Sequence, residues 1–479
     1  MIDVPTVVLD RGSGTPLSVQ LAEALRGAAA DGTLRPGDRL PSTRAFAAAL
    51  GVSRTVTVAA YDQLLAEGWL GGRRGAGTYV LGAVTAAPAA VPVPAGRPPE
   101  APALVDLRAG SPCLEVLDRA AWRRAWRTAG DGAPDAHPEP AGDPAFRSAV
   151  ADHLLRHRGL AAGADDVLAT AGTSAAVGEV ARTLPPGSRV AVEDPGYQRV
   201  VGALRDAGVE VVPAAVDDDG LVVEALPSDV AAVYCTPAHQ YPLGRRMSAA
   251  RRLELVARAR ADGWWVLEDD YDGELRYDVA PLPLLGALGP DVVVHLGTTG
   301  KIVSPTLGVG WLVAPGPLRG ALLARRTATG TRPPRAGQRV FAAFAASGDL
   351  ARHLRRLRRE LVGRAEEVRA AVAAAGRRAE GDAAGAHVLV PLPGPGAEEE
   401  VRTAAAARGV ALDDLARHTV SEGARRSGLV VGFAAPSREE LRRALPVLTE
   451  VLREHGRGPA SPRETDLVAP SGPGGSAQA

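Results

Sequence analysis

The sequence predicts two folded units in a row: a small helical unit over residues 12–81 and a larger α/β domain over residues 105–455. Three observations support this prediction. Residues 12–81 contain three helical patterns followed by a hairpin pattern. Residues 105–455 alternate short apolar, β-rich runs with Ala-, Arg- and Leu-rich stretches, which is typical of a mostly parallel sheet with helices on both faces. Between the units, residues 82–104 are rich in Ala and Pro and are expected to form an extended linker.

The composition limits the classes of protein that fit. The chain has 479 residues, 46% of them hydrophobic, and a formal net charge of +0, so a surface that binds nucleic acid must be a local patch. Cys113 and Cys235 lie far apart without metal-ligand spacing, which favours a reduced chain with no disulfide and no metal site. Signal patterns and runs of 18 apolar residues are absent, so we expect a cytoplasmic protein without a membrane segment. The Pro- and Gly-rich residues 456–479 are expected to form a disordered tail.

The first unit carries clear helix-boundary signals. A helix is expected from Pro16, a residue favoured in the first turn, to a stop at Gly32. Ser42 is placed to cap a second, short helix, and Ser53 to cap a third. Gly51 provides the tight turn between them, and residues 69–80 form two apolar runs around a Gly/Arg loop, which predicts a β-hairpin.

Two helices joined by a tight turn and followed by a basic hairpin have the layout of a winged helix-turn-helix. In this layout the third helix enters the major groove of double-stranded DNA by its N-terminus, and the wing meets phosphates. An interaction module with the same three helices remains open as an alternative. The candidate DNA contacts in the second helix, the third helix and the wing are Arg44, Ser53, Arg54, Thr55, Thr57, Arg73 and Arg74.

Residues 34–80 closely resemble the GntR-type winged helix over their whole length. The resemblance implies that Arg44 and Arg54 contact DNA and that Thr55 matches as well. Gly75 matches a glycine of the wing. Val56 stands where some members have a DNA-contacting threonine, so the preferred operator sequence is expected to differ.

Lysine and arginine together number 55, and Lys301 is the only lysine. An arginine stays protonated and cannot form a Schiff base, whereas a desolvated lysine amine can. The survival of a single lysine in an arginine-rich chain therefore predicts that Lys301 has a chemical role.

Three earlier segments of the larger domain place polar side chains after strands. TAGTSAAVGEVARTL (170–184) reads as a strand end, a glycine turn and a helix, whose start at Gly172, Thr173 and Ser174 suits a phosphate group. VEDPGYQRV (192–200) places an aromatic and an arginine at a sheet edge, where ligands of α/β proteins bind. CTPAHQYPLG (235–244) sets a histidine and a tyrosine between two prolines. The side chains of interest in these last two segments are Tyr197, Arg199, His239 and Tyr241.

WWVLEDDYDGE (264–274) is an apolar strand that runs into a cluster of carboxylates. Crowded carboxylates repel one another unless a cation meets them. A protonated pyridine nitrogen facing Asp269 is such a cation, and Tyr271 is placed to bond the ring hydroxyl. A divalent metal ion is the rival interpretation.

Lys301 lies 32 residues after Asp269, on the loop that is expected after the next strand. Thr298 lies three residues before Lys301. The GTTGK run looks like a phosphate loop, but its spacing is short. Ile302 also replaces the Ser or Thr that would hold magnesium, so this interpretation is set aside.

Together these segments resemble a fold-type-I aminotransferase, and its fusion to a GntR-type winged helix resembles the MocR (GabR-like) regulators. The resemblance covers roughly residues 12–455. It implies pyridoxal 5'-phosphate (PLP) held as an internal aldimine on Lys301, with Asp269 at the pyridine nitrogen and Tyr271 at the ring hydroxyl. The remaining expected cofactor contacts are Gly172, Thr173, Ser174, Tyr197, Tyr241 and Thr298. The expected effector contacts are Arg199 and His239.

Three features depart from the family pattern. Gly308 stands where an arginine usually clamps the cofactor phosphate. Thr299 and Gly300 replace a common Phe-Ser pair before the lysine. Val430 stands where many members hold the substrate carboxylate with an arginine. Losing a charge-assisted bond costs about 1.5–3 kcal/mol, so weaker cofactor binding and reduced transamination are expected.

The sequence thus predicts a homodimeric transcriptional regulator whose aminotransferase-like domain senses PLP, an amine or an amino acid and reorients two winged helices on operator DNA. Two alternatives remain open. One is an active aminotransferase with a vestigial DNA-binding head, and the other is a regulator whose effector domain no longer binds PLP.

Overall fold

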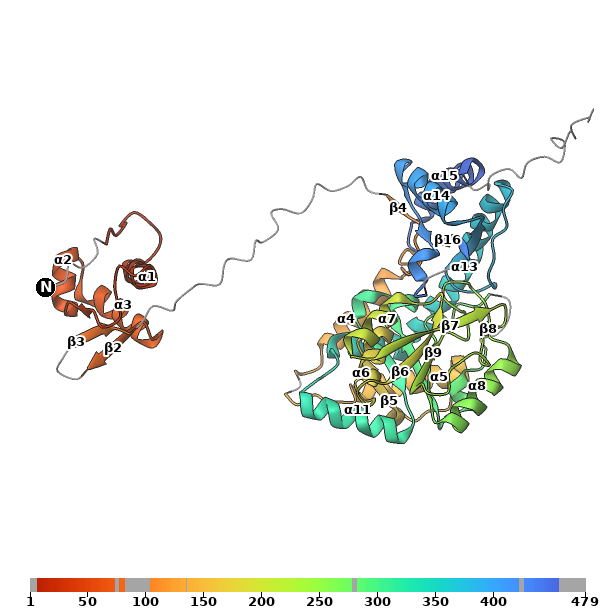
Figure 1. Cartoon of the computed structure of the whole chain (residues 1–479), viewed down its shortest axis with the longest axis horizontal. Helices are drawn as coiled ribbons and strands as arrows, with labels where there is room; N and C mark the ends of the chain where they lie inside the picture. The colour runs from red at the N-terminus through yellow and green to blue at the C-terminus, as the bar shows by residue number, and fades with distance from the viewer. Residues whose placement is uncertain are drawn as a thin grey trace, which may run out of the picture. The chain divides into compact units, whose positions relative to one another are not determined.

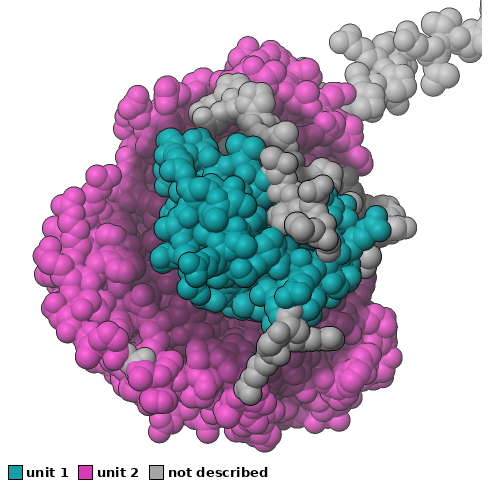
Figure 2. Space-filling model, turned by 90° about the vertical axis from the view of Figure 1, so that its left-hand side faces the viewer, with its two compact units in different colours: residues 1–101 teal, residues 102–479 magenta. Residues whose placement is uncertain are grey.

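The computed structural model describes residues 7–73, 77–81, 104–134, 136–277, 282–421 and 426–455. The chain divides into two compact units, residues 1–101 and 102–479 (Figures 1 and 2). The expected linker, apart from Leu104, and the expected tail lie outside the described residues, as do Arg74 and Gly75 of the wing.

The first unit has the predicted order of elements. Its helices are α1 (Leu17–Ala30), α2 (Thr43–Leu50) and α3 (Arg54–Ala66), and its strands are β1 (Arg39–Leu40), β2 (Leu70–Arg73) and β3 (Gly77–Val80). Ser42 caps α2, because its hydroxyl accepts a hydrogen bond from the Ala45 N–H at 3.2 Å. Ser53 precedes α3 without a capping side-chain bond. Gly51 ends α2 with φ +62°, a left-handed conformation that favours glycine.

A single apolar core holds these elements together. It is formed by the inner faces of the three helices with side chains from the small sheet, among them Leu21, Phe46, Tyr61, Leu64 and Leu70. The sheet order is β1-β3-β2, and β1 was not predicted from the sequence because it is only two residues long.

The larger unit is built on an eight-stranded sheet with the order β5-β12-β11-β10-β9-β6-β7-β8. The predicted parallel pairing is present: β10 lies between β9 and β11, and β6 lies between β9 and β7, each parallel to both neighbours. β12 runs antiparallel to both of its neighbours. The strands are β5 (Val167–Thr170), β6 (Arg189–Asp194), β7 (Glu210–Asp217), β8 (Gly220–Leu221), β9 (Ala232–Cys235), β10 (Trp265–Asp269), β11 (Val293–Thr298) and β12 (Gly310–Val313).

Helices cover both faces of this sheet. Alternate residues of one strand pack into different apolar clusters: Val190 and Val192 of β6 face α6 and α7, whereas Ala191 lies in the cluster that contains α8. The helices that precede the C-terminal part are α4 (Arg119–Gly130), α5 (Pro144–Arg158), α6 (Thr173–Ala181), α7 (Gln198–Asp206), α8 (Ala249–Asp262), α9 (Leu285–Leu288), α10 (Thr299–Ile302), α11 (Gly316–Thr329) and α12 (Arg335–Ala346).

The C-terminal part of this unit is a smaller layer of helices and strands, blue in Figure 1. The two-residue strand β4 (Val105–Asp106), at the start of the unit, pairs with β14 in this layer. The elements are α13 (Asp349–Ala374), β13 (His387–Leu392), α14 (Pro395–Ala407), β14 (Val410–Ala411), β15 (Asp413–Asp414), β16 (Ser427–Gly432) and α15 (Arg438–His455). Within the described ranges, no helix has both the length and the apolar character needed to cross a membrane.

Candidate cofactor and effector site

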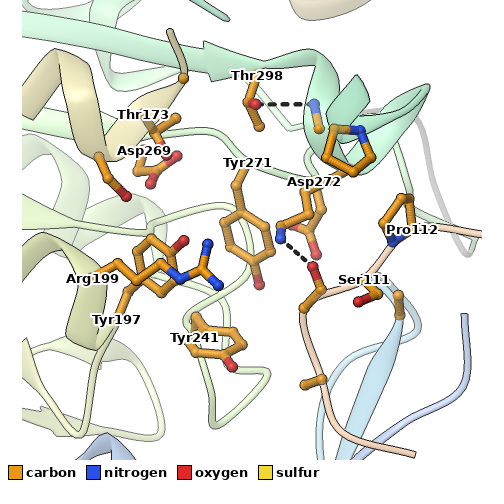
Figure 3. A pocket seen from close by; sticks show the side chains of 18 of the residues that line it. Ser111, Pro112, Thr173, Tyr197, Arg199, Tyr241, Asp269, Tyr271, Asp272 and Thr298 are labelled. Atoms are coloured by element: carbon orange, nitrogen blue, oxygen red, sulfur yellow. Dashed lines mark hydrogen bonds between the residues drawn. The ribbon is translucent and has the colours of Figure 1, made fainter. Parts of the chain in front are cut away.

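A cavity of about 630 Å³ lies where the starts of α6, α7 and α10 meet the end of β10. Parallel strands and their following helices converge at this edge of the sheet, which is where α/β folds bind ligands. Figure 3 shows the side chains that point into it. All the residues expected at the cofactor line the cavity, together with Arg199: Gly172, Thr173, Ser174, Tyr197, Tyr241, Asp269, Tyr271, Thr298 and Lys301.

Lys301 lies on the four-residue helix α10, which directly follows β11 where a loop was expected. Its amine donates a hydrogen bond to the Gly110 carbonyl oxygen. Burial lowers the pKa of Lys301, and the nearby Arg199 guanidinium lowers it further. The amine is therefore neutral at a lower pH than an ordinary lysine, as a nucleophile toward an aldehyde must be.

Asp269 ends β10, and only 2% of its surface is exposed. Its Oδ2 accepts a hydrogen bond from the Tyr234 hydroxyl at 2.7 Å, whereas its Oδ1 is buried without a hydrogen bond of normal geometry. The Thr173 side chain is near enough to lower the pKa of this carboxyl, but this effect is smaller than that of burial. Burial raises the pKa of Asp269 to about 7. A buried acceptor that lacks a donor fits the N–H of a protonated pyridine ring, so the residues present suit PLP at this position.

Donor groups suited to a phosphate lie at the Thr173 end of the cavity. Gly172 precedes α6 with φ +120°, and no side chain caps the first turn of this helix, so its backbone N–H groups remain available to an anion. The Thr298 hydroxyl oxygen accepts a hydrogen bond from the Gly300 N–H at 3.0 Å, which leaves its own hydrogen for another acceptor.

Most carboxylates after β10 have partners of their own. Glu268 accepts two backbone bonds, from the Leu285 and Gly286 N–H groups at 2.7 and 3.0 Å, and the remaining acids contact side chains. These pairs are Asp270 with Arg158 (2.6 Å), Asp272 with His239 (2.8 Å) and Glu274 with His153 (2.7 Å). Among the described residues, no group of three or more His, Cys, Asp or Glu side chains could hold a metal ion. Repulsion in the cluster is thus relieved pair by pair, and among the described acids of this cluster Asp269 has a buried oxygen without a hydrogen-bond partner.

The expectation that His239 contacts the effector is wrong in this structure. His239 is 2% exposed and is not among the residues that line the cavity. It lies behind Tyr271, with its ring 6.3 Å from the tyrosine ring, and its Nδ1 contacts Asp272. The Tyr271 hydroxyl donates to the His239 carbonyl oxygen at 3.1 Å. His239 therefore helps to hold Tyr271 in place from the core of the domain.

Tyr197, Tyr241 and Arg199 lie on the opposite side of Tyr271 from Thr298 in Figure 3. Tyr197 and Tyr241 pack edge to face, with ring centroids 5.8 Å apart. Tyr197 directly precedes α7, so Arg199 extends from the first turn of that helix over the cavity.

The two positions that lost a family arginine differ in their surroundings. Gly308 lines the cavity with φ +58°, and a Cβ atom there would contact nothing within 4 Å. Val430 is fully buried in a small apolar cluster, and its cross-strand partner in β15 is Asp413. Asp413 lines the cavity and contacts Arg417 at 3.1 Å and His418 at 3.3 Å. The position where the family pattern led us to expect an arginine thus lies beside an acid that already has partners.

Several lining residues were not predicted from the sequence. Gly110, Tyr234, Asp413 and Arg417 come from segments that carry no motif by themselves. Tyr234 alone offered a signal, since a polar group in an apolar strand needs a partner.

The candidate DNA contacts fall into two groups. Arg44, Ser53, Arg54 and Thr55 are exposed at the starts of α2 and α3. The prediction for Thr57 is wrong, because its side chain is fully buried in the unit and its hydroxyl has no partner. One turn into α3, this position already faces the core.

Both units match known protein families. Residues 17–80 match the family described as bacterial regulatory proteins, gntR family, and residues 103–448 match aminotransferase class I and II. The chain is 35% identical over 462 residues to the HTH-type pyridoxine biosynthesis transcriptional regulator PdxR of Corynebacterium glutamicum, covering 94% of this chain and 99% of the relative. It is 32% identical to the HTH-type transcriptional regulator TauR of Rhodobacter capsulatus, covering 76% and 83%.

Solved aminotransferases share the fold of the larger unit. A kynurenine aminotransferase of Pyrococcus horikoshii superposes with a TM-score of 0.66 at 24% identity, covering 74% of this chain and 92% of that chain. A multiple substrate aminotransferase of Thermococcus profundus gives 0.67 at 23% identity, covering 74% and 93%.

These matches settle the order of the two folds, the winged helix first and the aminotransferase fold second. The chain therefore belongs to the MocR-type transcriptional regulators, in which a GntR-family winged helix that binds DNA is joined to an aminotransferase-like domain that binds pyridoxal phosphate.

Proposed function

We propose that this regulator holds PLP on Lys301 and responds to PLP itself. The observation that carries the proposal is the unbonded, buried Oδ1 of Asp269 in the cavity that contains the single lysine. PLP supplies an aldehyde that condenses with an amine. Lys301 would provide that amine, Asp269 would hold the ring nitrogen, Tyr271 the ring hydroxyl, and the start of α6 with Thr298 the phosphate.

The cavity favours PLP over an amino acid as the signal. An amino acid would need a cation for its carboxylate, but Val430 stands where the family pattern led us to expect an arginine. The Arg417 guanidinium, which also lines the cavity, is already paired with Asp413 at 3.1 Å. Arg199 stays available to an anionic group of a second effector, so an amine or amino acid that displaces the lysine is the competing candidate. The likeness to a pyridoxine biosynthesis regulator favours vitamin B6 supply as the regulated process.

On the DNA side, we propose that Arg44, Ser53, Arg54 and Thr55 meet the operator and that a homodimer presents two such heads. Arg73, Arg74 and Gly75 of the wing remain candidates on sequence grounds. PLP binding would shift the population of dimers whose heads match the two half-sites. Because its DNA target is there, we expect the protein to act in the bacterial cytoplasm.

The test starts with the purified full-length chain. Adding PLP should produce visible absorbance, and borohydride reduction should fix the cofactor on Lys301, as read by mass spectrometry. The Lys301→Ala variant should show neither. PLP should change the amount of operator DNA that the wild-type chain retains. It should not change the amount that the Lys301→Ala variant retains. Absence of absorbance and label would reject the proposal. Steady transamination without specific DNA retention would favour an enzyme instead.

A further inference from the structure

Residues 104–113, which begin at the last residue of the linker, form an arm that leads from the C-terminal layer to Lys301. At its start, Val105 and Asp106 pair with Val410 and Ala411 of β14. The Leu107 N–H then donates to the Ala411 carbonyl oxygen at 2.9 Å. Further along, the Gly432 N–H donates to the Leu107 carbonyl oxygen at 2.7 Å. The first half of the arm is therefore held by strands of the C-terminal layer (β4, beside the blue elements in Figure 1).

The second half of the arm reaches the cavity. Residues 109–113 line it, and Ser111 and Pro112 are seen at its edge in Figure 3. The Gly110 carbonyl oxygen accepts the hydrogen bond of the Lys301 amine. Gly110 has φ +113°, and a Cβ at this position would lie 3.9 Å from Nζ. The space would admit a Cβ, but the positive φ that turns this carbonyl toward the lysine favours glycine.

Attachment of PLP changes what this nitrogen can donate. When the neutral amine condenses with an aldehyde, a carbon–nitrogen double bond forms and the carbon–oxygen double bond breaks. The oxygen leaves as water with both hydrogens of the amine. The nitrogen then no longer has the hydrogens that it used toward Gly110.

We propose that the Gly110 carbonyl senses whether Lys301 is free, and that attachment of the cofactor releases the tip of the arm. This inference rests on the proposed function, because it assigns the means by which that same site is read. Gly110 is exposed, so water replaces the lost donor and release leaves no buried group unsatisfied. Leu104, at the other end of the arm, is the last residue of the linker sequence that leads to the winged helix. The bond state of Lys301 thus acts on the chain at the point where the linker joins the effector domain.

Hydrogen exchange of the full-length chain tests the proposal, read on peptides that cover residues 104–113. The reference is the wild-type chain without ligand. Four samples are compared with it: the wild type with PLP, the wild type with pyridoxine 5'-phosphate, and the Lys301→Met and Lys301→Arg variants without ligand. Pyridoxine 5'-phosphate has the same ring and phosphate but an alcohol in place of the aldehyde, so it fills the site without forming the bond. Lys301→Met removes the donor, whereas Lys301→Arg keeps a donor that cannot condense.

PLP and Lys301→Met should each speed exchange in the arm by about 2- to 10-fold, the range expected for loss of one hydrogen bond. Pyridoxine 5'-phosphate and Lys301→Arg should leave it unchanged. Peptides from α5 serve as internal reference, and unfolding midpoints check that both variants fold.

Two results would overturn the inference: an arm that exchanges equally fast in the free wild type and in Lys301→Met, or equal loosening by the alcohol and by PLP. Failure of the proposed function is recognised separately, because PLP then gives no visible absorbance. The comparison of free wild type with Lys301→Met does not depend on PLP and still decides the inference.

Discussion

At the scale of single residues, Asp269 combines two demands that conflict in the absence of a ligand. Its burial disfavours the ionised form and raises its pKa to about 7, while a pyridinium partner needs that ionised form. The unfolded chain ionises this group near pH 3.9, so the folded state is progressively destabilised as pH rises from about 4 to about 7. The site is therefore suited to bind a cation, and without one the folded state is less stable near neutral pH.

Asp269→Asn tests this account. The amide keeps the shape and accepts from Tyr234 without a charge, so the cofactor-free variant should unfold at a higher temperature than wild type at pH 8. The difference should shrink as pH falls toward 4, because Asp269 is then neutral in the folded state and increasingly protonated in the unfolded state as well. PLP affinity of the variant should fall by about 10- to 150-fold, the loss of one charge-assisted bond of about 1.5–3 kcal/mol. Thermal scans at several pH values and a PLP titration measure both effects. Equal gains at pH 4 and pH 8 would contradict the assigned pKa.

Gly308→Arg tests whether the missing phosphate clamp weakens PLP binding. The position is open toward the cavity, and its left-handed backbone costs any other residue about 1–2 kcal/mol. Gly308→Gln carries the same backbone cost without the charge and is the matched control. PLP should bind about 10-fold more tightly to the arginine variant than to the glutamine variant. Equal affinities of the two variants would show that the phosphate lies elsewhere.

At the scale of elements, α3 separates residues that face DNA from residues that face the core. Arg54 and Thr55 are exposed at its start, and Thr57 is buried with an unsatisfied hydroxyl. Removing a buried hydroxyl that lacks a partner is favourable when the shape is kept.

Thr57→Val should therefore stabilise the first unit by about 1 kcal/mol and leave operator affinity unchanged. Arg54→Ala should do the reverse, lowering operator affinity by about 1–3 kcal/mol with little change in stability. Thermal unfolding and DNA titrations at fixed salt provide the two measurements. A loss of operator affinity in Thr57→Val, with the fold intact, would restore Thr57 as a DNA contact.

Elements with local signals were predictable from the sequence. Ser42 and Gly51 mark the ends of α2, and the cofactor residues follow strands whose apolar runs are continuous. What depends on pairing between distant segments was not predictable. The depth of His239, the pairing of Val430 with Asp413 and the position of Gly110 are set by contacts between segments 33, 17 and 191 residues apart, and no local pattern reports such contacts.

At the scale of the whole molecule, the two units have separate apolar cores. Each core can therefore melt without the other, and a ligand of one unit stabilises that unit alone. Calorimetry of the full chain should show two transitions, of which PLP raises only the larger. At a PLP concentration 100 times Kd the gain is about 2.7 kcal/mol. A single transition that moves as one with PLP would show that the units unfold together.

Because Lys301 is the only lysine in the sequence, proteolysis can measure the fraction of chains that carry the cofactor. A protease that cleaves only after lysine has one target bond in the whole sequence, between Lys301 and Ile302. A lysine fixed to its cofactor by reduction resists that protease even after denaturation. The ratio of uncut to cut chain on a gel would then count the fraction of molecules that carried the cofactor, with no spectrum and no DNA.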